Sequence, residues 1–226
     1  MSLGYKTSLY ASDYILSLYN HKYKTLSSSN KHYVVTNLNK SAVMLYIFIA
    51  FIRIFYNNPE YVFNTSIGVS DASQHKWKML TMLYACTDFV GLINAEKMPL
   101  STKVHHYGVV IAMGIVLLSD FRGASISKSM VIYGAFSSAA GIVNTYLGSR
   151  KILDKKGLLI RILKKLGLIS YIIACSANWS WQFKYLLVYL KQPEKLTVAL
   201  KFLLNSGLLY SWINDDLKLM RHLMTN

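Results

Sequence analysis

Hydrophobic residues are gathered into long blocks along this chain, and short basic segments separate the blocks. Six blocks are long and apolar enough to cross a bilayer as helices, since one span takes about 20 residues. Polar residues around Asn178 interrupt the fifth block, and Arg53 lies near the end of the first. The pattern predicts an all-α fold, a polytopic integral membrane helical bundle of about six transmembrane helices. The expected spans lie near 41–58, 77–95, 103–120, 129–148, 166–190 and 196–214.

The N-terminal segment differs from these blocks, because it is rich in lysine, serine and tyrosine. Within it, residues 9–19 are short and contain Asp13, which is typical of an amphipathic helix in the membrane interface rather than of a span. The segment lacks the continuous apolar core of a secretory signal, and it partly resembles an organelle transit segment without arginine. We expect a basic interfacial segment over 1–32 and a transmembrane domain over 33–222.

Composition and charge agree with a membrane protein. Hydrophobic residues make up 53% of the chain and charged residues 15%, whereas about 25% charged residues is usual in soluble domains. The net charge of +15 comes from basic residues between the apolar blocks, so nucleic acid is not an expected partner. With six spans, most of these residues fall on the side of both termini. The positive-inside rule therefore predicts both termini on the cytosolic side, or on the matrix side of a mitochondrial membrane.

A basic loop over 149–165 combines lysine and arginine with leucine and isoleucine. A helix there would lie on the membrane surface with its cations against anionic headgroups, and an ordinary positive-inside loop would also meet headgroups. Membrane lipids, anionic ones included, are therefore expected partners. The candidate headgroup-binding residues are Lys155, Lys156, Arg161, Lys164 and Lys165.

Candidate chemistry is concentrated in the hairpin between the second and third blocks, where Asp88, His105 and His106 interrupt apolar sequence. Ionisable groups at membrane depth are costly, so they usually face a bundle interior, a partner or a cavity. A short turn centred near Lys97 would bring Asp88 level with the histidines in an antiparallel hairpin. Because adjacent helical residues point about 100° apart, one histidine would meet Asp88 while the other faces another helix or a cavity.

This arrangement has two interpretations. A carboxylate beside an imidazole fixes its tautomer and raises its basicity, so Asp88, His105 and His106 would be catalytic residues, a general base for a hydroxyl or amine that attacks a thioester. Alternatively, the polar groups only lock two helices together. A metal is a further possibility, but the relative orientation of the three groups is not known from sequence. The residues alone identify no metal and no other cofactor.

The same hairpin resembles the TLC-domain family, which groups ceramide synthases with translocon-associated and lipid-homeostasis membrane proteins. The matching residues are YACTDF (84–89), MPLSTKVHH (98–106) and IVNTYLGSRKIL (142–153), and with spans and spacing counted the resemblance covers 33–222. It implies a helical bundle around a lipid-accessible cavity, with the histidines inside, in the endoplasmic reticulum. For ceramide synthases it would also imply acyl-CoA as a co-substrate.

The sequence departs from the ceramide synthases after the histidines. Their motif continues to an acidic cluster preceded by another histidine, whereas residues 121–141 contain neither. We therefore expect a divergent member that binds, senses or modifies membrane lipid and is not a ceramide synthase. The alternative is a non-catalytic accessory subunit of a large membrane complex, such as a respiratory assembly of the mitochondrial inner membrane, with other membrane subunits as partners. A transporter is not supported, since no inverted repeat is visible.

Overall fold

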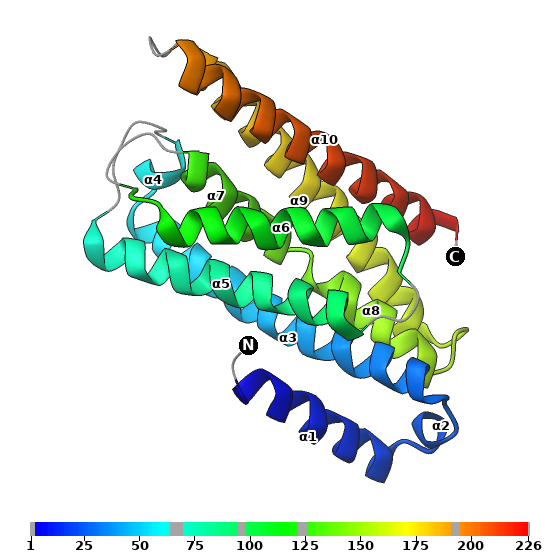
Figure 1. Cartoon of the computed structure of the whole chain (residues 1–226). Helices are drawn as coiled ribbons and strands as arrows, with labels where there is room; N and C mark the ends of the chain where they lie inside the picture. The colour runs from blue at the N-terminus through cyan, green and yellow to red at the C-terminus, as the bar shows by residue number, and fades with distance from the viewer. Residues whose placement is uncertain (1–2, 64–69, 95–97, 122–125, 191–194, 226) are drawn as a thin grey trace.

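The computed structural model describes residues 3–63, 70–94, 98–121, 126–190 and 195–225 (Figure 1). Within these ranges every regular element is an α-helix, which confirms the predicted all-α fold. The helices are α1 (Leu3–Tyr19), α2 (His21–Lys24), α3 (Ser28–Asn57), α4 (Glu60–Phe63), α5 (Asp71–Asn94), α6 (Leu100–Leu118), α7 (Ile126–Ser138), α8 (Gly141–Ile152), α9 (Leu158–Leu190) and α10 (Lys195–Thr225).

The long helices form a bundle in which α3 packs along α8, α5 along α6, and α9 along both α8 and α10 (Figure 1). The α5 and α6 helices run as the hairpin that the sequence predicts, although the turn at Lys97 lies outside the described residues. The α6 helix also contacts α10. These contacts place α6 between α5 and the C-terminal helix, so residues on different sides of α6 face different partners.

The close packing of α3 against α8 depends on two glycines of α8. A Cβ on Gly148 would lie 3.0 Å from Leu38 Cγ and 3.2 Å from the carbonyl oxygen of Val34. A Cβ on Gly141 would lie 3.1 Å from Met44 Cβ. Small residues let helix backbones approach in this way, as they do at helix interfaces in membranes.

Two helices in the described part of the chain, α3 and α6, are long and apolar enough to cross a membrane. A third span is added if α7 and α8, which are bent by 44° at a short break, cross as one unit. The block predicted as a single span over 129–148 is thus divided between α7 and α8. Six spans are not confirmed, and polar residues such as Asp88 in α5 and Asn178 in α9 interrupt two of the other predicted blocks.

The N-terminal helix α1 lies outside the bundle against α3 (Figure 1). Asn39 Nδ2 donates to Ser12 Oγ at 3.0 Å, and the Tyr23 hydroxyl donates to Asp13. The outward side of α1 carries exposed large side chains, including Tyr10 and Tyr14. The boundary expected at residue 32 falls inside α3, whose first turn begins at the N-cap Ser27.

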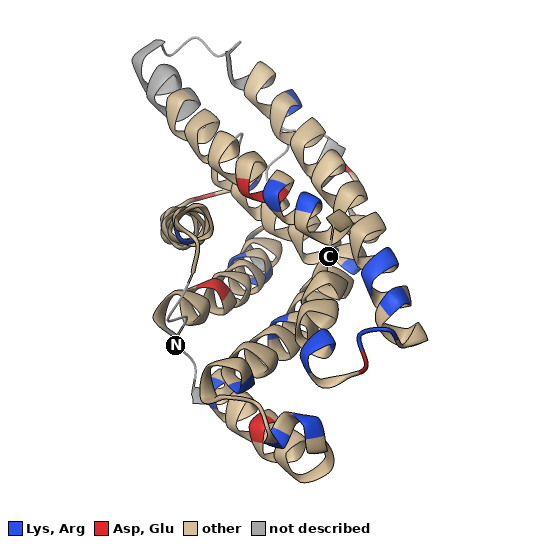
Figure 2. Cartoon of the chain, turned by 90° about the vertical axis from the view of Figure 1, so that its right-hand side faces the viewer, with Lys and Arg blue, Asp and Glu red and all other residues tan. Residues whose placement is uncertain are grey.

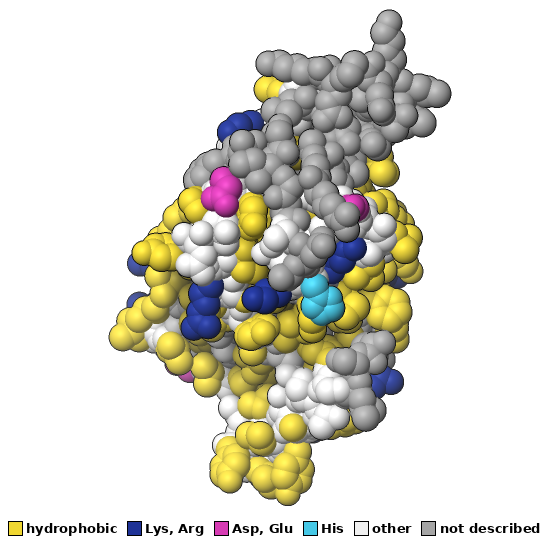
Figure 3. Space-filling view, turned by 90° about the vertical axis from the view of Figure 1, so that its left-hand side faces the viewer, with side chains coloured by type: hydrophobic (Ala, Val, Ile, Leu, Met, Phe, Trp, Pro, Cys, Tyr) yellow, Lys and Arg dark blue, Asp and Glu magenta, His cyan; other side chains and the backbone are white. Residues whose placement is uncertain are grey.

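Basic residues are concentrated around the α8–α9 connection, at the end of the molecule nearest the C-terminus (Figure 2). Lys155 and Lys156 are exposed in that connection, and Arg161 and Lys165 are exposed on the first turns of α9. Lys164, on the same turns, is half-buried. At the opposite end, the described side chains are mainly hydrophobic, with a few basic and acidic ones and a histidine among them (Figure 3).

Candidate functional site

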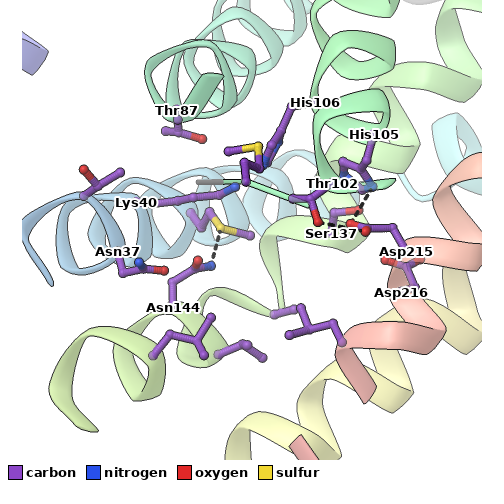
Figure 4. Close-up of a pocket in the computed structure, with 18 of the residues that line it drawn as sticks. Asn37, Lys40, Thr87, Thr102, His105, His106, Ser137, Asn144, Asp215 and Asp216 are labelled. Carbon is purple, nitrogen blue, oxygen red and sulfur yellow. Dashed lines mark hydrogen bonds and ion pairs between the residues drawn. The ribbon is translucent and has the colours of Figure 1, made fainter. Parts of the chain in front are cut away.

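The bundle encloses a cavity of about 720 Å³ that α3, α5, α6, α7, α8, α9 and α10 line (Figure 4). The cavity reaches the exposed residues Ser28, Ser29 and Lys218, so it opens where α3 begins and α10 ends. One part of its wall is apolar, with Val143 and Leu147 of α8 and Ala174 of α9. The other part is polar and includes both histidines of the α5–α6 hairpin.

Asp88 is completely buried on α5 and contacts two groups from neighbouring helices. The Lys40 ammonium of α3 forms an ion pair with Asp88 Oδ1. His106 Nδ1 of α6 lies 3.1 Å from the same oxygen, although the ring is not aligned for a hydrogen bond. The spacing argument, which placed Asp88 level with the histidines, therefore agrees with the structure.

His105 faces a different carboxylate from the one beside His106. Its Nδ1 lies 3.6 Å from Asp215 Oδ2 of α10, and Asp215 Oδ1 accepts a hydrogen bond of 3.0 Å from Thr102 Oγ1. The two imidazole rings lie 5.5 Å apart and nearly perpendicular, at 79°. The rotation between neighbouring helical residues predicts this divergence. The result is two acid–imidazole couples, and both histidines and Asp215 line the cavity (Figure 4), whereas Asp88 is not among its lining residues.

Two buried aromatic side chains lie beside His105. Tyr133 of α7 and Trp212 of α10 stack with ring centroids 3.9 Å apart, and each ring centroid lies 6.5 Å from that of His105. Both aromatic side chains are buried. These rings give the imidazole an apolar surface on the side of α7 and α10, while His105 also lines the cavity.

A second acid of α10, Asp216, also lines the cavity and is held by two donors from α9. The Tyr171 hydroxyl donates to Asp216 Oδ1 at 2.6 Å, and Trp179 Nε1 donates to Oδ2 at 3.1 Å. Both oxygens therefore have partners, which is the usual condition for a buried carboxylate. Asp216 joins α9 to α10, whereas Asp215 is the acid that meets a histidine.

The cavity mouth carries a histidine whose titration is shifted. Arg150 Nη1 lies 2.9 Å from His222 Nε2, which joins α8 to α10. Burial, followed by the charges of Arg150 and Lys164, lowers the pKa of His222 below its ordinary value. The neutral ring is therefore favoured in the folded protein.

Sequence reasoning missed Lys40, Asp215 and Asp216. The first expected span begins at residue 41, directly after Lys40, whereas α3 begins at Ser28 and carries Lys40 within the bundle. The expected last span ended at residue 214, just before the two acids. A signal was present, since two adjacent carboxylates directly follow an apolar block. Their partners, however, come from packing between helices far apart in sequence.

The candidate headgroup-binding residues Lys155, Lys156, Arg161, Lys164 and Lys165 do not line the cavity. The two free cysteines, Cys86 and Cys175, do not pair, and only Cys175 lines the cavity. The groups suited to a metal ion are Asp88, His105 and His106, each of which offers one ligand atom within 4.8 Å of the others. Comparison with protein-family models, characterised proteins and solved structures finds no match to this chain.

Proposed function

We propose that this is an integral membrane protein that binds a membrane lipid in the cavity and acts on it through the histidine pair. The observation that carries the proposal is the cavity itself. At about 720 Å³ it is within the range of small-molecule sites, and it joins an apolar wall to two acid–imidazole couples. An acyl chain fits the apolar wall, and a polar headgroup fits the wall that carries His105 and His106.

The chemistry that suits these residues is proton transfer at a lipid hydroxyl or amine. A neutral imidazole next to a carboxylate is a general base, and His106 has Asp88 at 3.1 Å. Lys40 neutralises that carboxylate at the same oxygen, Oδ1. The resemblance to the TLC-domain family supports a lipid substrate, and acyl-CoA as co-substrate rests on that resemblance alone. Without the downstream acids, ceramide synthesis is not the proposed reaction.

The proposed topology keeps six spans with both termini on the cytosolic side. In addition to the apolar α3 and α6, it is supported by large exposed hydrophobic side chains on the outer faces of α5, α6 and α9. They include Met79, Phe89, Ile93, Tyr107, Ile111, Leu118, Ile169, Ile173 and Phe183. The basic α8–α9 connection, with Lys155, Lys156 and Arg161, would then meet anionic headgroups. Residence in the endoplasmic reticulum follows from the family resemblance.

An accessory subunit of a larger membrane assembly is the second candidate, with the mitochondrial inner membrane as its location. The same exposed hydrophobic faces favour it, because they would also fit other membrane subunits. In that case the Lys40, Asp88 and His106 contacts would serve to join α3, α5 and α6. The cavity would then hold no lipid.

Co-purification of lipid tests the proposal. The wild-type protein and the variant Ala174→Trp would be purified in detergent, and bound lipid would be extracted and quantified by mass spectrometry. Ala174 is buried and lines the cavity, so the larger tryptophan ring should fill part of the cavity and lower the amount of bound lipid several-fold. The control is Ile173→Trp, because the preceding residue is 63% exposed on the same helix. Thermal unfolding of each variant checks that it folds. Ala174→Met is a smaller substitution at the same position, to be used if Ala174→Trp does not fold.

Equal lipid in the wild type and in a folded Ala174 variant would overturn the cavity as the binding site. Recovery of the wild type as a stoichiometric part of a large assembly, with no bound lipid, would favour the accessory subunit.

A further inference from the structure

We propose that Asp88, His105 and His106 bind a divalent transition-metal ion at the polar wall of the cavity. The proposal rests on the cavity of the proposed function but does not require a bound lipid. A histidine that ligates the ion is not free to act as a base, so with the ion bound a metal-bound water would be the base in place of His106. His105 and His106 project from α6 between Lys40 and Asp215 (Figure 4), and Asp88 approaches from α5. The three ligand atoms all lie within 4.8 Å of one another.

The cluster contains buried polar atoms that lack hydrogen-bond partners. Within the described part of the chain, Asp88 Oδ2, His105 Nδ1 and His106 Nδ1 are buried without a hydrogen-bond partner. Buried polar groups normally have partners, and leaving one unsatisfied is destabilising. Three such atoms in one place mark a site that is shaped for a ligand rather than for helix packing alone. A cation that accepts electron pairs from carboxylate and imidazole would satisfy this set.

The distances between the three ligand atoms are close to those around a single metal ion. Zinc binds nitrogen and oxygen ligands at about 2.0–2.2 Å, so two ligands on one tetrahedral ion lie roughly 3.4 Å apart. The widest pair, which lies within 4.8 Å, therefore has to close by at most roughly 1.4 Å. Rotation of the two imidazole rings supplies a change of this size without moving α5 or α6. Three protein ligands would leave a coordination position open toward the cavity, as in catalytic zinc sites.

The net charge of the cluster also favours a bound cation. Asp88 and Asp215 carry two negative charges, and Lys40 contributes one positive charge. With neutral imidazoles the cluster has an excess of one negative charge, which a divalent ion with a bound hydroxide would balance. Lys40 contacts only Oδ1 of Asp88, and this leaves Oδ2 for the ion. Asp215, whose Oδ2 lies 3.6 Å from His105 Nδ1, adds negative charge beside the ion without belonging to the ligand set.

The ligand types select the kind of metal. Two imidazoles with one carboxylate suit zinc, cobalt or iron(II), whereas magnesium and calcium prefer oxygen ligands only. We therefore assign the site to first-row transition ions and exclude the alkaline-earth ions.

Metal analysis of the full-length protein without a polyhistidine tag tests the assignment. The purified protein would be incubated with Zn²⁺, Co²⁺ or Fe²⁺, desalted, and measured by plasma mass spectrometry and, for Co²⁺, by visible absorption. We expect about one equivalent of Zn²⁺ or Co²⁺ per chain, with cobalt bands that excess Zn²⁺ removes. Mg²⁺ should not compete. Wild-type protein that retains less than about a tenth of an equivalent of all three ions would overturn the proposal.

Three variants locate the site. His105→Gln, His106→Gln and Asp88→Asn should each lower metal affinity at least about tenfold, because each removes one of three ligands. His75→Gln is the matched control, since His75 is an exposed histidine on α5, the same helix as Asp88. Metal binding that survives both histidine substitutions would also overturn the proposal. A protein that retains lipid but takes up no metal would overturn the metal site and leave the proposed function standing. A protein that binds metal but retains no lipid would overturn the proposed function and leave the metal site standing.

Discussion

His105 and His106 are neighbours in the chain but face different acids, Asp215 of α10 and Asp88 of α5. This divergence makes α6 the centre of the site, because one turn of helix reaches two sides of the bundle. A polar contact that only joins two helices would need one of these acid–imidazole couples, not both. Two acid–imidazole couples beside one cavity therefore support the proposal that this site binds a ligand and takes a proton from it.

Removing Lys40 should leave the buried Asp88 carboxylate without its cation. Lys40→Met is expected to lower the free energy of unfolding by about 3–5 kcal/mol, measured by denaturant titration in detergent. The double variant Lys40→Met with Asp88→Leu should regain much of that loss, since no charge is then left unpaired. Lys184→Met, at an exposed position of α9, is the control. A Lys40 variant as stable as the control would show that the ion pair does not stabilise the fold.

Gly148→Ala should be destabilising, because the new methyl group would meet Leu38 Cγ at 3.0 Å and the Val34 carbonyl oxygen at 3.2 Å. The expected loss is about 1–3 kcal/mol, measured as above. Gly114→Ala on α6 is the matched case, since no atom lies within 4 Å of its Cβ position. It should be neutral or stabilising by up to about 1 kcal/mol, the gain in helix propensity. If Gly148→Ala were neutral, α3 and α8 would not pack as closely as described.

The stability of the protein should fall in mild acid through His222. Its pKa in the folded protein is lowered by burial and by Arg150 and Lys164, so the unfolded chain binds the proton more readily. The contribution is fully present above the unfolded pKa of about 6.5 and is lost as pH falls below it toward the folded pKa. Thermal unfolding would be measured at pH 7.5 and 5.5. The decrease in Tm between the two pH values should be larger for the wild type than for His222→Gln. Equal decreases would remove His222 from the explanation.

Much of the fold and part of the site could be predicted from the sequence. Helical fold and hairpin depend on local patterns, and counting from the turn was enough to pair Asp88 with a histidine. Lys40 and Asp215 were not found, because their roles depend on how α3 and α10 pack against the hairpin. The break between α7 and α8 was missed for a similar reason, since a hydropathy block does not record a bend.

Substitution of His106 separates catalysis from structure. Cells that lack the protein would receive the wild type, His106→Gln or the control His75→Gln, and their lipids would be profiled. If His106 is a general base, His106→Gln should fail to restore the wild-type profile, while the purified variant keeps its fold and its bound lipid. Full restoration by His106→Gln, and by the double variant His105→Ala with His106→Ala, would exclude a catalytic role.

The central claim, that the cavity binds a lipid against the histidine pair, is tested most directly by an experimental structure of the protein purified from its own membrane. We predict density for one lipid inside the cavity, with its chain along Val143 and Ala174 and a polar atom about 2.6–3.2 Å from His105 or His106. A cavity closed by side chains, or lipid density confined to the outer faces of α5 and α6, would contradict the claim.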